Sequence, residues 1–112
     1  MALSKKQCIP CRRETPRLEG KILEEYCSLL SGWTAVGEQY LTKTYPFPDF
    51  TSGLAFVNRV GELAEQEDHH PDIYLTWGKV EVKIYTYIIK GLSENDFILA
   101  AKIDEVLGLN KK

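Results

Sequence analysis

The stretch that decides the fold is Lys79-Val80-Glu81-Val82-Lys83-Ile84-Tyr85-Thr86-Tyr87, where the character of the side chains alternates from one residue to the next. Successive side chains of a β-strand point to opposite faces of its sheet. One face of this strand is therefore formed by Val80, Val82, Ile84 and Thr86. The opposite face is formed by Lys79, Glu81, Lys83, Tyr85 and Tyr87. We expect the first face to meet a hydrophobic core and the second to be exposed or to line a site.

Helices and further strands are predicted on both sides of this strand from apolar periodicity and from the positions of glycine and proline. The predicted helices span residues 17–30, 50–67 and 93–107. The further predicted strands span residues 33–36, 39–47 and 73–77. The order α-β-β-α-β-β-α, with short turns between paired strands, indicates an α+β fold: a four-stranded antiparallel sheet with three helices on one face. Ser93 and Asp96 resemble a capping box at the start of the last helix.

The composition is that of one ordinary globular domain. The chain has 112 residues, of which 44% are hydrophobic and 27% are charged, and its net charge is −2. This charge gives no electrostatic argument for nucleic-acid binding. No apolar run approaches the ~20 residues that span a bilayer, and the first residues lack the apolar core of a signal peptide. We therefore expect a cytoplasmic protein without membrane contact.

The chain contains three cysteines, Cys8, Cys11 and Cys27. An odd number without a signal peptide argues against a disulfide framework. Cys8 and Cys11 have the CxxC spacing of a zinc or redox pair, but a structural zinc site needs four ligands and no second pair supplies them. A zinc site completed by a second subunit is one interpretation. We favour a flexible N-terminal arm over residues 1–14 that carries the CxxC pair, followed by a single domain over residues 15–112.

Both histidines of the chain are adjacent, in Gln66-Glu67-Asp68-His69-His70-Pro71-Asp72-Ile73-Tyr74, where the second predicted helix ends. Neighbouring helical side chains point about 100° apart, which disfavours the binding of one metal ion by both rings. The helix C-terminus favours the imidazolium form, so each ring could titrate near neutral pH, as proton transfer requires. Glu65 stands one turn before His69 and could hydrogen-bond its ring. The residues alone also fit a polar helix end that has no function.

Three motifs resemble those of the pterin-4a-carbinolamine dehydratase family: Glu65-x-x-x-His69-His70-Pro71-Asp72-Ile73, Val80-Glu81-Val82-Lys83-Ile84-Tyr85-Thr86 and Gly91-Leu92-Ser93-Glu94-Asn95-Asp96-Phe97-Ile98-Leu99-Ala100. Upstream, Gly32-Trp33 and Tyr45-x-Phe47-x-Asp49-Phe50 also match, so the similarity covers about residues 15–108. The family removes water from 4a-hydroxytetrahydropterin and gives quinonoid dihydropterin, which recycles the cofactor of aromatic amino-acid hydroxylases. The resemblance implies this lyase activity, with the pterin as substrate and with no cofactor and no metal.

The resemblance also implies the site. Its catalytic residues are His69 and His70, which supply the acid and the base for the loss of water. Its substrate-binding residues are Glu65, Asp68, Pro71, Thr86, Asp96 and Trp33. The family has a third histidine where this chain has Tyr87, and a tyrosine, with an ordinary pKa of about 10, is a poor base at neutral pH. Tyr87 shares a strand face with Lys83 and Tyr85, so we expect its side chain to face the site and the activity to be reduced.

The missing third histidine leaves a second function open. The family includes a transcriptional coactivator and a branch proposed as assembly factors for the carboxysomal carbon-fixing enzyme. The alternative is therefore a weakly active or non-catalytic member that acts as a binding, assembly or coactivator protein with a protein partner. The resemblance also implies a homodimer or homotetramer that extends the sheet and packs helices between subunits, without direct contact to nucleic acid.

Overall fold

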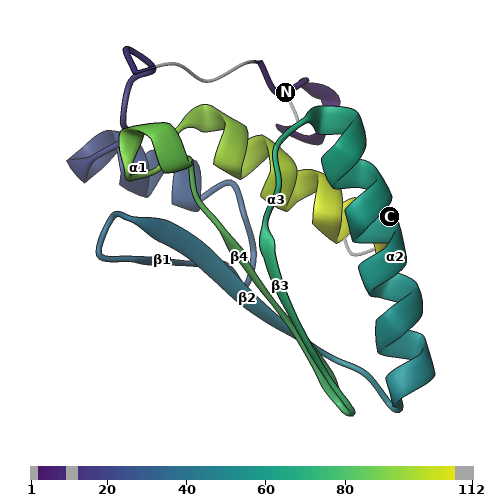
Figure 1. Cartoon of the computed structure of the whole chain (residues 1–112). Helices are drawn as coiled ribbons and strands as arrows, with labels where there is room; N and C mark the ends of the chain where they lie inside the picture. Colours follow the sequence, from purple (N-terminus) through teal and green to yellow (C-terminus); the bar gives the residue numbers. More distant parts are fainter. Residues whose placement is uncertain (1–2, 10–12, 108–112) are drawn as a thin grey trace.

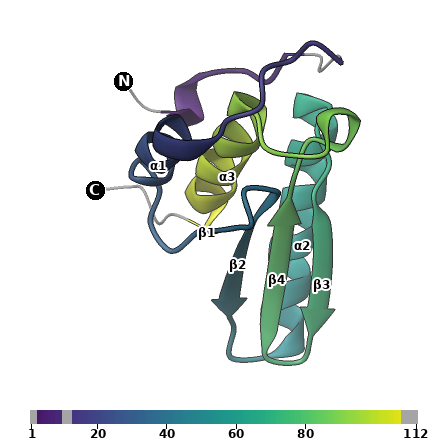
Figure 2. The same ribbon diagram turned by 90° about the vertical axis from the view of Figure 1, so that its left-hand side faces the viewer.

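The computed structural model describes residues 3–9 and 13–107. Its helices are α1 (Gly20–Cys27), α2 (Phe50–Glu67) and α3 (Glu94–Val106), with the short 3₁₀ turns η1 (Leu3–Lys5) and η2 (Tyr87–Ile89). Its strands are β1 (Thr34–Val36), β2 (Tyr40–Pro46), β3 (Asp72–Thr76) and β4 (Lys79–Ile84). All pairings are antiparallel, in the order β1-β2-β4-β3, and α2 lies behind β3 and β4 in Figure 2. The predicted α+β fold class and its order of elements are confirmed (Figure 1).

Strand β4 has the two faces that its alternation predicts. Val80, Val82 and Ile84 are fully buried, and Thr86 beyond the strand is nearly so. They join the core formed with the inner sides of α2 and α3, which includes Phe56, Val60, Phe97 and Leu99. The opposite face of the sheet carries the charged and tyrosine side chains and is more exposed. A site can therefore form on either side of the end of β4.

The strand predicted over residues 79–87 ends earlier, at Ile84. Pairing with β2 stops at Leu41 opposite Ile84, and pairing with β3 stops at Asp72 opposite Lys83. Beyond these points the backbone has no neighbouring strand on either side. It instead closes on itself through an isolated bridge between Thr86 and Gly91, and the chain between them turns through η2.

Helix α2 has the predicted bounds, and Phe56, Val60 and Ala64 of its apolar face are buried. Its N-cap carboxylate, Asp49, accepts a hydrogen bond from Ser52 N at 2.8 Å. Phe50 and Leu54, which follow the same helical spacing of apolar residues from the start of the helix, are instead 43% and 41% exposed. The contact runs through Gly53, where a Cβ atom would lie 3.0 Å from Leu75 Cδ1. The buried stripe therefore runs through Gly53, Phe56, Val60 and Ala64, and the spacing of apolar residues alone does not reveal which edge of a wide apolar face meets the sheet.

Helix α1 is shorter than the predicted range of 17–30 because both of its ends are held by other bonds. Leu18 N donates to Leu92 O at 2.8 Å, so the chain before α1 lies extended against the loop ahead of α3. After α1, Leu30 N donates to Cys27 O, the tighter spacing of a turn, before the left-handed Gly32 at φ 84°. The other predicted boundaries are within one or two residues of the observed ones.

The N-terminal segment, residues 3–9, lies against α3. Leu3 and Ser4 are buried, Ser4 Oγ donates to Glu105 Oε2 at 2.5 Å, and Lys6 forms an ion pair with Glu94. Cys8 packs on the core, while its predicted CxxC partner Cys11 lies outside the described residues. The boundary between an arm and a domain at residue 15 stays a prediction.

Candidate active site

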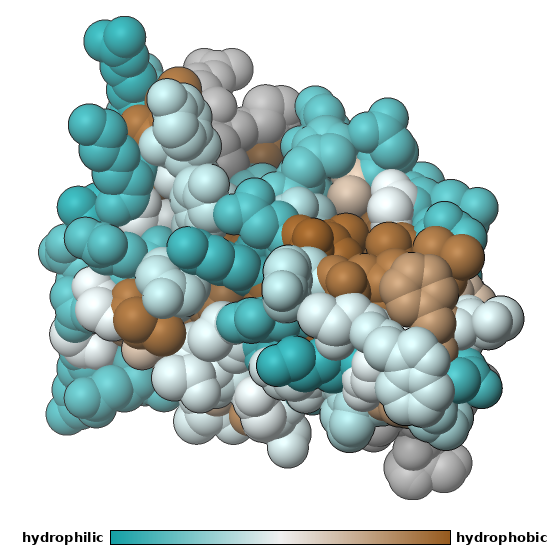
Figure 3. Space-filling model, turned by 60° about the horizontal axis from the view of Figure 1, so that its bottom comes forward, coloured by the Kyte–Doolittle hydropathy of each residue, from teal (hydrophilic) through white to brown (hydrophobic). Residues whose placement is uncertain are grey.

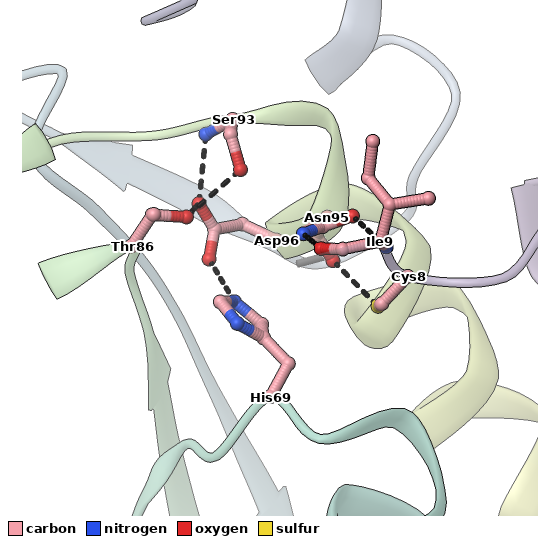
Figure 4. A network of polar contacts seen from close by, with 7 residues as sticks. All are labelled: Cys8, Ile9, His69, Thr86, Ser93, Asn95 and Asp96. Carbon is pink, nitrogen blue, oxygen red and sulfur yellow. Dashed lines mark hydrogen bonds and ion pairs between the residues drawn. The ribbon is translucent and has the colours of Figure 1, made fainter. Parts of the chain in front are cut away.

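Asp96 is the centre of a buried polar network at the start of α3 (Figure 4). Its Oδ2 accepts hydrogen bonds from Thr86 Oγ1 at 2.7 Å and from Ser93 N at 2.8 Å. Its Oδ1 lies 2.7 Å from His69 Nε2. The predicted capping box is confirmed, and the same carboxylate that caps the helix also binds the first histidine. Each oxygen of this fully buried carboxylate therefore has a partner.

His69 reaches Asp96 because the chain reverses direction directly after α2. Asp68, the C-cap, adopts a left-handed conformation at φ 53°, which aspartate tolerates better than most residues. His69 N donates to Ala64 O at 3.2 Å, which closes the helix end. The His69 side chain, 12% exposed, then points inward to α3. Asp68 itself is exposed on the outside of this turn.

His70 has a carboxylate partner of its own. Its Nε2 lies 2.6 Å from Glu65 Oε2, and the two side chains are 54% and 78% exposed. The sequence-based hypothesis of a bond between Glu65 and His69 is wrong, because the left-handed Asp68 interrupts the helical phase before the histidines. The His69 side chain contacts Asp96 on α3, and the His70 side chain contacts Glu65 instead. The two rings therefore occupy different environments, one enclosed and one open to solvent.

The two rings lie in different surroundings just before β3 begins. The pairing of β3 with β4 ends at Asp72 opposite Lys83, so both histidines precede the paired part of the sheet. His69 and Thr86 both contact Asp96 in the buried network. His70 is exposed and contacts the exposed Glu65.

A cavity of about 370 Å³ lies on the open face of the sheet. It is lined by Gln39, Tyr40, Lys83, Tyr85, Tyr87 and Lys90. The Lys83 ammonium lies 4.2 Å from the centre of the Tyr40 ring. Tyr87, 81% exposed, is part of this wall and not of the Asp96 network. Aromatic rings beside ammonium groups suit a flat, polar, electron-rich ring system.

The structure does not bring Trp33 to the histidines. Its Nε1 donates to Asp104 Oδ2 at 3.1 Å, and Asp104 stands eight residues beyond Asp96, about 12 Å along α3. Asp104 is buried and also accepts bonds from Tyr45 Oη at 2.6 Å and Lys43 Nζ at 2.9 Å. Burial and this carboxylate raise the pKa of Tyr45. The sequence analysis did not identify this cluster. The feature that could have indicated it is Asp104, an acidic residue within the apolar sequence of α3.

Neither a metal site nor a reactive thiol is apparent at this end of the molecule. Within residues 3–9 and 13–107, no group of three histidine, cysteine or acidic side chains is arranged to hold a metal ion. The pKa of Cys8 is raised to about 12, first by burial and then by the Glu67 carboxylate. A thiol of this kind stays protonated at neutral pH and is a poor nucleophile.

In the described part of the chain, no helix has the length and apolar character needed to cross a membrane.

These elements define a small α+β domain with a histidine pair, each ring held by a carboxylate, at one end of its sheet. The family model described as pterin 4 alpha carbinolamine dehydratase matches residues 16–106. The chain belongs to this family. A Rubrobacter xylanophilus relative whose name places it among these dehydratases is 46% identical over 104 residues, which is 93% of this chain and 97% of the relative. A Rickettsia bellii relative of the same name is 49% identical, with 92% of each chain covered.

Solved structures give the same fold. The structure of a transcriptional coactivator/pterin dehydratase from Brucella melitensis is similar with a TM-score of 0.78 and 30% identity, over 83% of this chain and 100% of that one. A pterin dehydratase-like protein described as a RuBisCO assembly factor in the α-carboxysome has a TM-score of 0.60 and 22% identity, over 70% of this chain and 92% of that one. At this identity the second likeness concerns the fold alone.

Proposed function

We propose that this protein is a dehydratase that removes water from 4a-hydroxytetrahydropterin to give quinonoid dihydropterin, with His69 and His70 as its acid–base groups. The observation that carries the proposal is the pairing of each ring with a carboxylate, at 2.7 Å for His69 with Asp96 and 2.6 Å for His70 with Glu65. A carboxylate on one ring nitrogen fixes the orientation and the tautomer of the ring. The family to which the chain belongs performs this dehydration.

The reaction moves two protons, which suits two differently placed rings. One proton must reach the departing 4a-hydroxyl group, and another must leave a ring nitrogen of the pterin. His70 is open to solvent, and in this proposal it exchanges a proton with a pterin bound in the tyrosine-lined cavity. His69 lies in the enclosed network of Asp96 and Thr86. Pro71 fixes the backbone directly after the pair and so restricts the direction in which the rings point.

Replacement of His70 by alanine tests the proposal. We expect the wild-type protein to accelerate dehydration of the 4a-carbinolamine, and His70→Ala to lower kcat by about 10²–10⁴-fold, the range for a lost acid–base group. The rate is followed by the absorbance of the quinonoid product. Lys21→Ala, an exposed change on α1, serves as the control and should match the wild type. A wild-type rate equal to the uncatalysed one, at high protein concentration, would exclude the enzyme.

The second candidate is a non-catalytic member that acts through a protein partner. The observation that favours it is Tyr87, which is 81% exposed beside the 45% exposed Ile88, where the family has an imidazole. An exposed aromatic and aliphatic pair is more typical of a contact surface than of a proton-transfer group. Retention of a partner by the His69→Ala/His70→Ala double variant, together with absence of turnover in the wild type, would select this candidate.

We also propose that the chain forms a homo-oligomer through the outer side of α2. Phe50 and Leu54, one helical turn apart, expose apolar side chains there. Figure 3, turned toward the end of the molecule where α2 begins, shows a large hydrophobic patch on the α2 side. Self-association would remove this apolar surface from water.

The oligomer has a direct test in solution. Leu54→Lys changes an exposed side chain and should leave the fold intact, while a charge in the contact should shift the protein to a monomer. Sedimentation equilibrium measures the mass. Ala55→Lys, exposed and about 100° around the helix, should keep the wild-type mass. A monomeric wild-type protein would contradict the proposal.

A further inference from the structure

The N-terminal segment crosses between α2 and α3 beside the histidine network (Figure 4). Cys8 N donates to Glu67 Oε1 at 2.9 Å, which ties the segment to α2. Ile9 is tied to α3 by two bonds with one side chain: Ile9 N donates to Asn95 Oδ1 at 3.1 Å, and Asn95 Nδ2 donates to Ile9 O at 2.6 Å. The Cys8 thiol adds a contact to Asn95 O at 3.6 Å.

The two residues that hold the segment are placed next to the residues of the buried pair. Glu67 is the last residue of α2, two positions before His69. Asn95 directly precedes Asp96 in the first turn of α3. The bond from His69 to Asp96 joins the same two helix ends that the segment joins. The N-terminal segment and the His69–Asp96 contact therefore both connect the end of α2 to the start of α3. A change in the distance between these two helix ends would affect both connections.

We propose that Asn95 and Glu67 are positioning residues: by holding residues 8 and 9 they fix the end of α2 against the start of α3, and this sets the contact between His69 Nε2 and Asp96 Oδ1. The inference rests on the proposed function for its effect on catalysis. It adds a part of the chain to the site that precedes residues 16–106, the region matched by the family model. In this proposal the N-terminal segment, which lies outside the loop that carries His69, fixes the orientation of the His69 ring.

Burial and charge make the two anchors effective. Asn95 is buried, so loss of its bonds to Ile9 would leave polar backbone groups without these partners. The Glu67 side chain is 12% exposed and lies 3.4 Å from Lys102 Nζ. Burial acts to raise the pKa of Glu67, but the Cys8 N–H and Lys102 outweigh it and lower the pKa overall. The carboxylate is thus ionised at neutral pH, when it accepts most strongly.

Loss of the two anchors is expected to lower kcat. Loss of the anchors lets the helix ends move apart by fractions of an ångström, and a misplacement of about 1 Å can reduce a rate about 10²-fold. The His69–Asp96 contact is enclosed, with 12% and 0% of the two side chains exposed, and neither residue lines the cavity on the open face. The surface that would bind the substrate is therefore unchanged. A loss confined to the chemical step lowers kcat and leaves KM near its original value.

Asn95→Ala is the first test, with kcat, KM and thermal unfolding measured together. We expect kcat to fall about tenfold while KM stays within about twofold. Ser4→Ala is the matched control, because it removes a side-chain bond of the same segment, to Glu105 at the other end of α3. It should leave kcat unchanged even if it lowers the unfolding temperature. Equal kcat values in Asn95→Ala and the wild type, or equal losses in the two variants, would overturn the proposal.

A second pair of variants, at Glu67, tests the proposal without relying on the Asn95→Ala substitution. Glu67→Ala should lower kcat, whereas Glu67→Gln keeps an oxygen that can accept from Cys8 N and should restore most of it. If the wild type has no turnover, the proposed function fails, and the positioning role is read from the His69 side chain by NMR. The imidazole should then become more mobile in Asn95→Ala and not in Ser4→Ala. An unchanged imidazole would contradict the inference independently of activity.

Discussion

Replacement of Asp96 by alanine is expected to lower the free energy of unfolding by about 3–5 kcal/mol, because it removes a buried carboxylate that binds three groups of the protein. Asp96 is fully buried and accepts bonds from Thr86 Oγ1 and Ser93 N while it contacts His69 Nε2. Without the carboxylate, Ser93 N and His69 Nε2 lose this partner inside the protein, and Thr86 Oγ1 keeps only Ser93 Oγ, at 2.8 Å. Each buried group left without a partner costs about 1–3 kcal/mol. The start of α3 also loses half of its capping box.

Urea unfolding followed by circular dichroism measures the change. The control is Asp49→Ala, which removes another carboxylate that caps a helix, but an exposed one that accepts a bond from Ser52 N. Loss of an exposed cap costs about 1 kcal/mol. The difference between the two variants isolates the buried network from helix capping in general. Equal destabilisation by both changes would show that the His69 and Thr86 contacts add nothing to the stability of the fold.

Replacement of Tyr87 by histidine is expected to raise kcat about 10²-fold, because it supplies an imidazole where the family has one. A phenol with an ordinary pKa of about 10 is protonated at pH 7 and cannot take a proton, whereas an imidazole with one of about 6.5 can. Tyr87 is 81% exposed on the wall of the cavity. The exchange of an exposed ring should change stability by less than about 0.5 kcal/mol.

The dehydratase assay is run on both proteins across pH 5 to pH 9. Tyr74→His provides the control, because Tyr74 is an exposed tyrosine of β3 on the same face of the sheet, opposite Glu81. It should not change the rate. A gain specific to Tyr87→His would show that the natural residue limits the chemistry. If neither variant is faster than the wild type, the tyrosine is either sufficient or outside the reacting geometry.

The elements that the sequence predicted correctly depend on local rules. Alternation along residues 79–84 is a property of strand geometry, and the start of α2 follows from Asp49, whose side chain caps the helix. The capping box of α3 depends on two residues in one turn. None of these features requires knowledge of a distant part of the chain, so each was available from neighbouring residues.

The contacts of the candidate site needed the tertiary structure. The sequence placed Glu65 with His69, but one left-handed residue changes the direction of the chain and gives each histidine a different acid. Trp33, assigned to the site by resemblance, lies on Asp104 instead. The position of a side chain after a helix end depends on the conformation of single residues and on the packing of helices distant in sequence, and neither is encoded in local periodicity.

The sequence by itself therefore determined the α+β order of elements, the two faces of β4 and the resemblance to the dehydratase family. The tertiary structure alone decided which stripe of α2 is buried, which acid holds which histidine, and that the N-terminal segment joins α2 to α3. The physical reason is the distance along the chain over which each interaction acts. Strand alternation and helix capping act over a few residues, whereas the bonds of Asp96 to His69 and of Asn95 to Ile9 span 27 and 86 positions of the chain.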